Sequence, residues 1–373
     1  MEKYNEKLKI AIIGANESIA MLISKAKDLG YETHVFAWSC GDPGEYIADH
    51  FYPISIDNKE LILDKCREIG ICAVCSITSD FAAPIVAYVA RHLGLSGNPK
   101  RTDIVARDKY EMRKALQNKD IYCPKFIEVD AKLQLQGISD FNYPVIVKPT
   151  DRWSSKGVTR VDSIKSLVPA IEQACRESLS GKAIVEEFMN GPEYSAECIV
   201  YQGEITILAF TQKITTGYPH YIEKGHKQPS DLTFNQKNAA KKVIERAIKA
   251  LDITNSASHV EFRVLDNGEI GIIEIGARMG GDCIGTHLTP LSTGMDYIKM
   301  VIDVACGRRP DFTILSRPSH VQVNYIIDES DIEEYHKIPR SRIVLKSEFD
   351  NDFSKDVVDS STRHGYYIFL KEE

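Results

Sequence analysis

Residues 258–276 read SHVEFRVLDNGEIGIIEIG, and this stretch decides the fold. Asn267-Gly268 is the dipeptide most typical of a two-residue β-turn, and apolar residues alternate with polar ones on both sides of it. A turn centred there predicts a hairpin in which Glu261 lies directly opposite Glu274. Opposed residues have Cβ atoms roughly 5 Å apart, and at that distance two carboxylates repel each other. We therefore expect a cation between them, and carboxylate oxygens favour a hard ion such as Mg²⁺.

The other face of the predicted hairpin is apolar and is expected to face the core. It carries Val260, Phe262 and Val264 on one strand and Ile273 and Ile275 on the other. After the hairpin, Arg278 lies in the glycine-rich segment GARMGG, and its guanidinium offers a fixed fork of donors to phosphate or carboxylate. The alternative interpretation is a pair of solvated glutamates on an edge hairpin.

Composition indicates an ordinary soluble protein. The chain has 373 residues, enough for two or three domains, with 43% hydrophobic and 27% charged residues. A net charge of −7 argues against a surface for nucleic acid or anionic membrane. The N-terminal residues are too polar for a signal peptide, and no apolar run approaches the ~18 residues of a membrane span. The nine scattered cysteines are typical of reduced thiols in the cytoplasm, and Cys72-Ala-Val-Cys75 is interpreted as strand core rather than a metal or redox site.

The hydrophobic pattern divides the chain into three regions. Residues 1–100 alternate strand and helix, which predicts a parallel sheet with helices on both faces. Residues 101–190 combine a linker helix with a small α+β unit, and residues 191–373 have the alternation typical of an antiparallel sheet. The long polar segment 212–229 is predicted to be a loop, and such loops are often functional. The predicted fold class is therefore α/β together with α+β.

Four further segments carry candidate chemistry, and each has a structural alternative when taken alone. Lys148 ends the apolar strand 145–149 and needs an anionic partner such as phosphate, unless its amine extends to solvent. The loop 151–157 has small residues whose backbone N–H groups suit phosphate oxygens, and is otherwise a hairpin loop. Residues 186–193 combine acids with backbone groups suited to adenine and ribose, and are otherwise a charged linker. The segment 212–229, rich in Tyr, His and Lys, is either part of a site or a solvated loop.

The order and spacing of these segments resemble the ATP-grasp superfamily along essentially the whole chain. The resemblance implies a pre-grasp domain in residues 1–100, a lid in residues 101–190 and a catalytic grasp domain in residues 191–373. It also implies ATP and Mg²⁺, with Mn²⁺ as an alternative ion. The implied assignments are Lys109 and Lys148 to the ATP phosphates; Ser154, Ser155 and Gly157 to the loop that closes over them; Glu186, Glu187, Phe188 and Met189 to adenine; Glu193 to the ribose; Glu261 and Glu274 to the metal; and Arg278 to the transferring phosphate.

The segment from Glu274 to Gly281 is similar to the E-x-x-x-R-x-x-G pattern of L-amino-acid (dipeptide) ligases and their relatives. Many family members carry Asn two residues after the second metal-binding Glu, whereas Gly276 stands there in this chain, so the coordination of a second ion is open. The activity that the resemblance implies is carboxylate–amine ligation through an acyl phosphate, with an amino acid as the carboxylate. Lys213 and His226 are then candidate contacts to the carboxylate substrate or to the tetrahedral oxyanion.

Two other functions stay open as alternatives. One is the activation of bicarbonate or another small acid, as in carboxylases and carbamoyl-phosphate synthase halves, although no biotinyl-carrier segment is visible. The other is a nucleotide-binding regulator without turnover, which would be expected to lack a metal-binding acid or a phosphate-binding lysine. The expected partners are small-molecule carboxylates and amines rather than nucleic acid or membrane, and the resemblance also suggests a homodimer.

Overall fold

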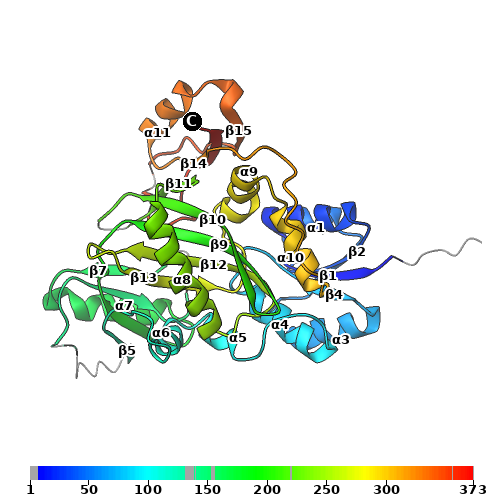
Figure 1. The fold of residues 1–373 in the computed structure, drawn as a ribbon, viewed down its shortest axis with the longest axis horizontal. Helices are drawn as coiled ribbons and strands as arrows, with labels where there is room; N and C mark the ends of the chain where they lie inside the picture. The colour runs from blue at the N-terminus through cyan, green and yellow to red at the C-terminus, as the bar shows by residue number, and fades with distance from the viewer. Residues whose placement is uncertain are drawn as a thin grey trace, which may run out of the picture.

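The computed structural model describes residues 7–130, 138, 140–152, 156–218, 221–354 and 356–372, which contain three β-sheets. Figure 1 shows the largest sheet in the middle of the molecule, the N-terminal sheet with its blue and cyan helices beside one end of it, and the small green-cyan sheet with α7 beside the other. None of the helices in these residues is long and apolar enough to cross a lipid bilayer.

The N-terminal sheet is parallel, as the alternating pattern predicted, with the strand order β3-β2-β1-β4. Its strands are β1 (Lys9–Ile13), β2 (Glu32–Phe36), β3 (His50–Tyr52) and β4 (Ala73–Cys75), and its helices are α1 (Glu17–Asp28), α2 (Pro43–Ile47), α3 (Lys59–Ile69) and α4 (Ala82–Leu93). The apolar side chains of α3 and α4 cover one face, and those of α1 cover the other together with α10 (Tyr297–Ala305). A helix from far along the chain thus completes this core.

The small sheet is antiparallel and has the order β5-β8-β6-β7. Its strands are β5 (Phe126–Asp130), β6 (Val145–Pro149), β7 (Thr159–Val161) and β8 (Lys182–Glu187). The 3₁₀ turn η1 (Ile164–Ser166) leads into α7 (Leu167–Glu177), which packs its buried residues on one face. The other face of β6 and β8 is left to line a cavity.

The large sheet is antiparallel and has the order β13-β12-β9-β10-β11-β14-β16-β15. Its strands are β9 (Glu193–Tyr201), β10 (Glu204–Thr215), β11 (Glu223–Gln228), β12 (Ser256–Val264), β13 (Ile270–Gly276), β14 (Val321–Tyr325), β15 (Ile343–Lys346) and β16 (Tyr366–Leu370). Around it lie α5 (Thr102–Val105), α6 (Lys109–Gln117), α8 (Phe234–Ala250), the π-helical turn η2 (Ile284–Leu288), α9 (Thr289–Thr293), α11 (Glu329–Lys337) and η3 (Arg340–Arg342). The α/β and α+β fold class is confirmed, while the domain boundaries at 100 and 190 stay a prediction.

The hairpin of β12 and β13 has a longer turn than predicted. The Leu265 amide donates to the Glu269 carbonyl at 2.8 Å, which leaves a loop of residues 266–268. Within this loop Gly268 has a φ of 83°, whereas Asn267 is not in the positive-φ region. A two-residue type I′ turn needs positive φ at both central residues, so the predicted turn type is wrong.

A bulge in β13 compensates for the longer turn. Phe262 pairs with Ile272, yet Glu261 pairs with Glu274, so Ile273 is an extra residue on one strand. The bulge restores the predicted pairing of the two glutamates. It also turns Ile273 away from the core, where we expected it, and toward the cavity.

Two other expectations about secondary structure were wrong, and one strand was missed. The polar segment 212–229 is mostly the end of β10 and all of β11 rather than a loop. The linker helix expected at the beginning of residues 101–190 is two helices, α5 and α6, because Asp108 caps α6 by accepting from the Glu111 amide at 2.9 Å. The short edge strand β3 was not predicted at all.

Candidate active site

A cavity of about 180 Å³ lies between the small sheet and the β12–β13 end of the large sheet. Eleven of the residues predicted from sequence line it: Lys109, Lys148, Glu186, Glu187, Phe188, Met189, Glu193, Lys213, Glu261, Glu274 and Arg278. His226 lines an adjoining cavity instead, and Ser154 and Ser155 lie outside the described residues. Gly157 has a φ of 72°, and a Cβ there would lie 3.0 Å from Pro149, so the described end of the predicted phosphate loop packs against β6.

Each glutamate of the opposed pair has a lysine as its partner. Lys213 Nζ lies 2.9 Å from Glu261 Oε1, and Lys109 Nζ lies 3.0 Å from Glu274 Oε1. Lys109 begins α6, which places its ammonium under β13, where it also donates to the carbonyl of Arg152. Positive charge therefore does accompany the pair, supplied by protein groups.

Lys213 lies at the centre of an acidic cluster. Its Nζ is 3.1 Å from Glu193 and 3.7 Å from Glu223, in addition to Glu261. Burial by itself lowers the pKa of Lys213, but the three carboxylates raise it well above its usual value. The ammonium is thus permanently charged, and its contacts are to protein acids.

The carboxylate of Glu186, on β8, contacts two cationic side chains, Arg113 on α6 and Lys148 on β6. Its Oε1 is 2.6 Å from Arg113 Nε, and its Oε2 is 2.7 Å from Lys148 Nζ. Burial raises the pKa of Glu186, but Arg113 and Lys148 lower it more strongly, from 4.5 to about 2. Both oxygens of this buried carboxylate are engaged, so its side chain aims Lys148 at the cavity. The predicted role at adenine would fall to the neighbouring backbone.

Glu186→Gln is expected to destabilise the fold by about 3–5 kcal/mol near pH 7, because it leaves Arg113 and Lys148 buried without an anion. A lowered pKa contributes stability above 4.5 that is lost as the pH falls toward 2, so the difference between wild type and variant should shrink across that range. Urea unfolding at a series of pH values measures this.

The matched control is Glu187→Gln on the next residue. Glu187 accepts from the Asn142 amide at 2.9 Å near the surface, so the change should cost no more than about 1 kcal/mol. A constant difference between wild type and Glu186→Gln from pH 7 to pH 2 would contradict the assignment.

Arg278 is held by Asp80, which follows β4 in the N-terminal sheet. Its Nε and Nη2 donate to the two carboxylate oxygens at 2.8 and 2.7 Å. Asp80 does not cap the following helix α4, because Ser79 Oγ accepts from the Ala82 amide there at 3.1 Å. A Cβ at Gly276 would lie 2.8 Å from Asp80 Oδ1, so glycine leaves room for this ion pair.

Sequence reasoning missed the buried pair of His259 and Glu197. His259 Nδ1 bonds to Glu197 Oε1, and His259 Nε2 lies 3.2 Å from Glu261 Oε1. The other oxygen of Glu197 accepts from the Gly280 amide at 2.9 Å. Burial lowers the pKa of His259, but Glu197 and Glu261 raise it more. Strand alternation was the available signal, because His259 lies on the same face of β12 as Glu261.

An aromatic shelf closes the cavity at the end of β8. The guanidinium groups of Arg160 and Arg263 each lie 4.8 Å from the centroid of the Phe188 ring. Arg263 also donates to the carbonyl of Met189 at 3.0 Å and to Glu193 at 3.0 Å. The Phe188 amide donates to Pro144, which ties the segment to the small sheet. This arrangement suits a flat heteroaromatic ring.

A second cavity of about 320 Å³ continues from the first. The two share the residues Asp80, Lys213, Glu223, His259, Glu261 and Arg278. The second extends to Asn16 and Thr78 at the carboxyl ends of the parallel strands, where ligands of such sheets usually bind. Their common residues lie where the two cavities adjoin.

His226 lies beneath the second cavity on β11. Its ring is 1% exposed, and Nε2 is 3.7 Å from Asp282 Oδ2. Arg363 donates to both oxygens of Asp282, at 3.1 and 2.7 Å. Burial raises the pKa of Asp282, but His226 and Arg363 hold it well below its usual value. A charged carboxylate therefore faces this cavity.

Comparison with known proteins identifies the class of fold. Residues 141–286 match the family model of the ATP-grasp domain. An L-amino acid ligase from Bacillus licheniformis superposes with a TM-score of 0.81 over 98% of this chain and 94% of that chain, at 24% identity. Phosphoribosylglycinamide synthetase from Anaerococcus prevotii superposes with a TM-score of 0.77 over 99% and 95%, at 21% identity. The chain has the ATP-grasp fold, and its predicted resemblance is confirmed.

Several relatives found by sequence are ligases by name. Alanine–anticapsin ligase from Bacillus subtilis is 29% identical over 297 residues, which cover 70% of this chain and 60% of that protein. D-alanine–D-alanine ligase from Acetivibrio thermocellus is 30% identical over 185 residues, which cover 46% of this chain and 48% of that protein. The chain thus spans about 60% of the length of the alanine–anticapsin ligase that it matches.

Proposed function

We propose that this protein is an ADP-forming ATP-grasp ligase that joins a carboxylate to an amine. The observation that carries the proposal is the pair of continuous cavities that share Glu261, Arg278 and four other residues. A nucleotide in the first cavity would present its terminal phosphate to a carboxylate in the second. The names of the relatives, an L-amino acid ligase and an alanine–anticapsin ligase among them, support the same reaction class.

The first cavity suits ATP from one end to the other. The adenine would lie at the shelf of Phe188 and Met189, the ribose near Glu193, and the phosphates near Lys109 and Lys148. Glu186 already holds the Lys148 side chain in place, so this lysine would lose little conformational entropy when a phosphate binds. The lysines would contact the phosphates of ATP, and the planar shelf would contact its adenine ring.

The opposed glutamates fit a divalent ion by their chemistry. Both offer carboxylate oxygens, the ligands that Mg²⁺ prefers, and both already accept from a lysine ammonium. Glu261 and Glu274 would hold Mg²⁺, which would neutralise charge on the nucleotide phosphates. Gly276 offers no side-chain ligand, and the Asp80–Arg278 ion pair occupies the space beside it.

The proposed reaction has two steps. A carboxylate oxygen of the substrate displaces ADP from the terminal phosphorus, and an acyl phosphate forms. The amine then attacks the acyl carbon, loses a proton and expels inorganic phosphate. Arg278, held in place by Asp80, would stabilise the charge that moves onto the transferring phosphoryl oxygens. Lys213 would act by supporting Glu261 and Glu193, because its donors already meet protein acids.

An amino acid is the substrate that the second cavity suits best. It combines the cationic Arg278 with the anionic Asp282 and Glu223, groups that complement the carboxylate and the ammonium of a zwitterion. His226 lines the same cavity with a ring that is 1% exposed, and it would support Asp282 at 3.7 Å. A homodimer stays a prediction.

Phosphate release tests the proposed function. Purified protein with ATP and Mg²⁺ should release phosphate and ADP in the presence of two amino acids and form a dipeptide that mass spectrometry detects. Omission of one amino acid should remove most of the release. Release that depends on bicarbonate would instead support activation of a small acid, and tight ATP binding without release from any pool would support a regulator.

A further inference from the structure

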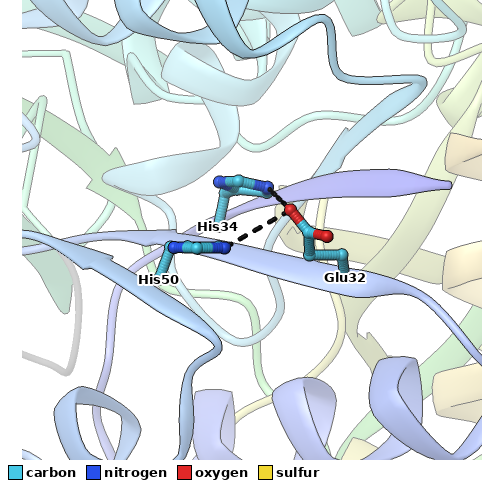
Figure 2. A group of neighbouring side chains, drawn as sticks. All are labelled: Glu32, His34 and His50. Carbon is cyan, nitrogen blue, oxygen red and sulfur yellow. Dashed lines mark hydrogen bonds and ion pairs between the residues drawn. The ribbon is translucent and has the colours of Figure 1, made fainter. Parts of the chain in front are cut away.

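A group of metal-binding side chains lies in the N-terminal sheet, outside the cavities described above. His34 on β2 pairs in register with His50 on β3, and Glu32 precedes His34 by two residues on the same face. Figure 2 shows both imidazoles side by side with their Nε2 atoms directed at the carboxylate of Glu32. Glu32 and His50 are at the beginnings of parallel strands, whereas the second cavity lies at the carboxyl ends of this sheet.

The three side chains converge on one point. His34 Nε2 and His50 Nε2 lie 2.9 and 3.4 Å from the same oxygen, Oε1 of Glu32. The rings stack with centroids 4.6 Å apart and planes 14° apart, and the three candidate ligand atoms all lie within 4.8 Å of one another. Ligands of a tetrahedral zinc ion at about 2.0–2.1 Å lie about 3.3 Å apart, so small side-chain movements would complete the geometry.

A fourth residue, Tyr52, already orients the buried side chain of His34. His34 Nδ1 lies 3.0 Å from the hydroxyl of Tyr52, and the Tyr52 ring stacks on Phe36 at 4.8 Å. When Nδ1 carries its proton and donates it to Tyr52, Nε2 presents its lone pair to the Glu32 side. Metal-binding histidines generally have such a partner on their second nitrogen.

We propose that Glu32 Oε1, His34 Nε2 and His50 Nε2 bind one zinc-class divalent cation, with water in the fourth position. Two imidazoles and one carboxylate suit Zn²⁺, whereas Mg²⁺ prefers oxygen ligands alone. The His50 side chain is 51% exposed, which gives the ion a path of entry. The ion would link the edge strand β3 to β2, where the sheet has just three residues of pairing.

The positive charge of Lys9 opposes the ion. Lys9 on β1 is paired in register with Glu32, and its charge acts on His34. The site is therefore expected to bind zinc less tightly than it would without this lysine. Lys9→Gln should tighten binding, a change that a purely hydrogen-bonded cluster would not produce.

Equilibrium dialysis of the chelator-treated full chain against Zn²⁺ tests the site. We expect one zinc ion per chain whose binding requires Glu32, His34 and His50. Zinc affinity should be at least about a hundredfold weaker in His50→Ala and about 10–100-fold weaker in Tyr52→Phe. His92→Ala, which removes an exposed histidine on α4 that is not part of the cluster, should bind as the wild type does. Co²⁺ in place of Zn²⁺ should give the intense visible absorption of a tetrahedral site.

Thermal unfolding provides a second measurement. Zn²⁺ should raise the melting temperature of the wild type and of His92→Ala but not that of His50→Ala, because the ion would no longer join β2 to β3. His50 is exposed, so its replacement should leave the metal-free fold intact. Equal zinc affinity in His50→Ala and wild type, or no ion bound by the wild type, would overturn the proposal.

Discussion

Glu274→Gln is expected to lower kcat at least about a hundredfold while the protein stays folded. The amide preserves the volume of the side chain but removes one of the two negative charges proposed to hold Mg²⁺. Glu274 is partly exposed, with 29% of its side chain accessible, and Lys109 keeps its bond to the Arg152 carbonyl. The melting temperature should therefore change by no more than about 4 °C, as circular dichroism can measure.

Glu269→Gln is the matched control for this substitution. Glu269 is exposed at the turn of the same hairpin, where it bonds to Asn267, and it lines neither of the two cavities. Its replacement should leave kcat unchanged. Full activity in Glu274→Gln would disprove the metal assignment, and unfolding of that variant would show that the glutamate serves the structure instead.

Arg278→Lys is expected to lower kcat by about 10²–10³-fold with little change in ADP affinity. Lysine retains the charge and one contact with Asp80, so a buried carboxylate is not left without a cation. It loses the fork with which arginine binds Asp80 through two nitrogens at once. ADP affinity should be preserved because the aromatic shelf at Phe188 is formed by other residues.

The control for the arginine is Arg309→Lys. Arg309 is 71% exposed and pairs with Glu204 at the surface, so its replacement should alter neither kcat nor ADP binding. Single-turnover measurements with ATP and substrate separate chemistry from product release. A variant Arg278→Lys with wild-type chemistry and weaker nucleotide binding would place Arg278 in nucleotide binding rather than in phosphoryl transfer.

The pairing of Glu261 with Glu274 could be predicted although the predicted turn was wrong. The loop is one residue longer than expected, and a bulge at Ile273 restores the register. The predicted pairing holds because the extra loop residue and the extra residue of the bulge offset each other, which returns Glu261 and Glu274 to opposite positions. A bulge depends on packing across the whole sheet, so local sequence did not reveal it.

Other ion pairs of the site could not be predicted from the sequence, because they join residues that are far apart along the chain. Glu186 on strand β8 contacts Arg113 on helix α6, and Asp80, which follows β4, contacts Arg278 some two hundred residues later. Neither partner has a local sequence signal. The segment 212–229 was taken for a loop because its polar residues face a buried ionic cluster, an environment that composition cannot distinguish from solvent.

The sequence by itself determined most of the elements, the fold class and many of the residues that line the first cavity, because strand alternation and turn residues act over short distances. Only the tertiary structure decided which charged side chains pair with one another. It joined Lys213 to three glutamates and Glu186 to two cations, and it made Gly276 necessary beside Asp80 and Arg278. Pairing between buried charges depends on distances across separate elements, and these distances exist only once the sheets have packed together.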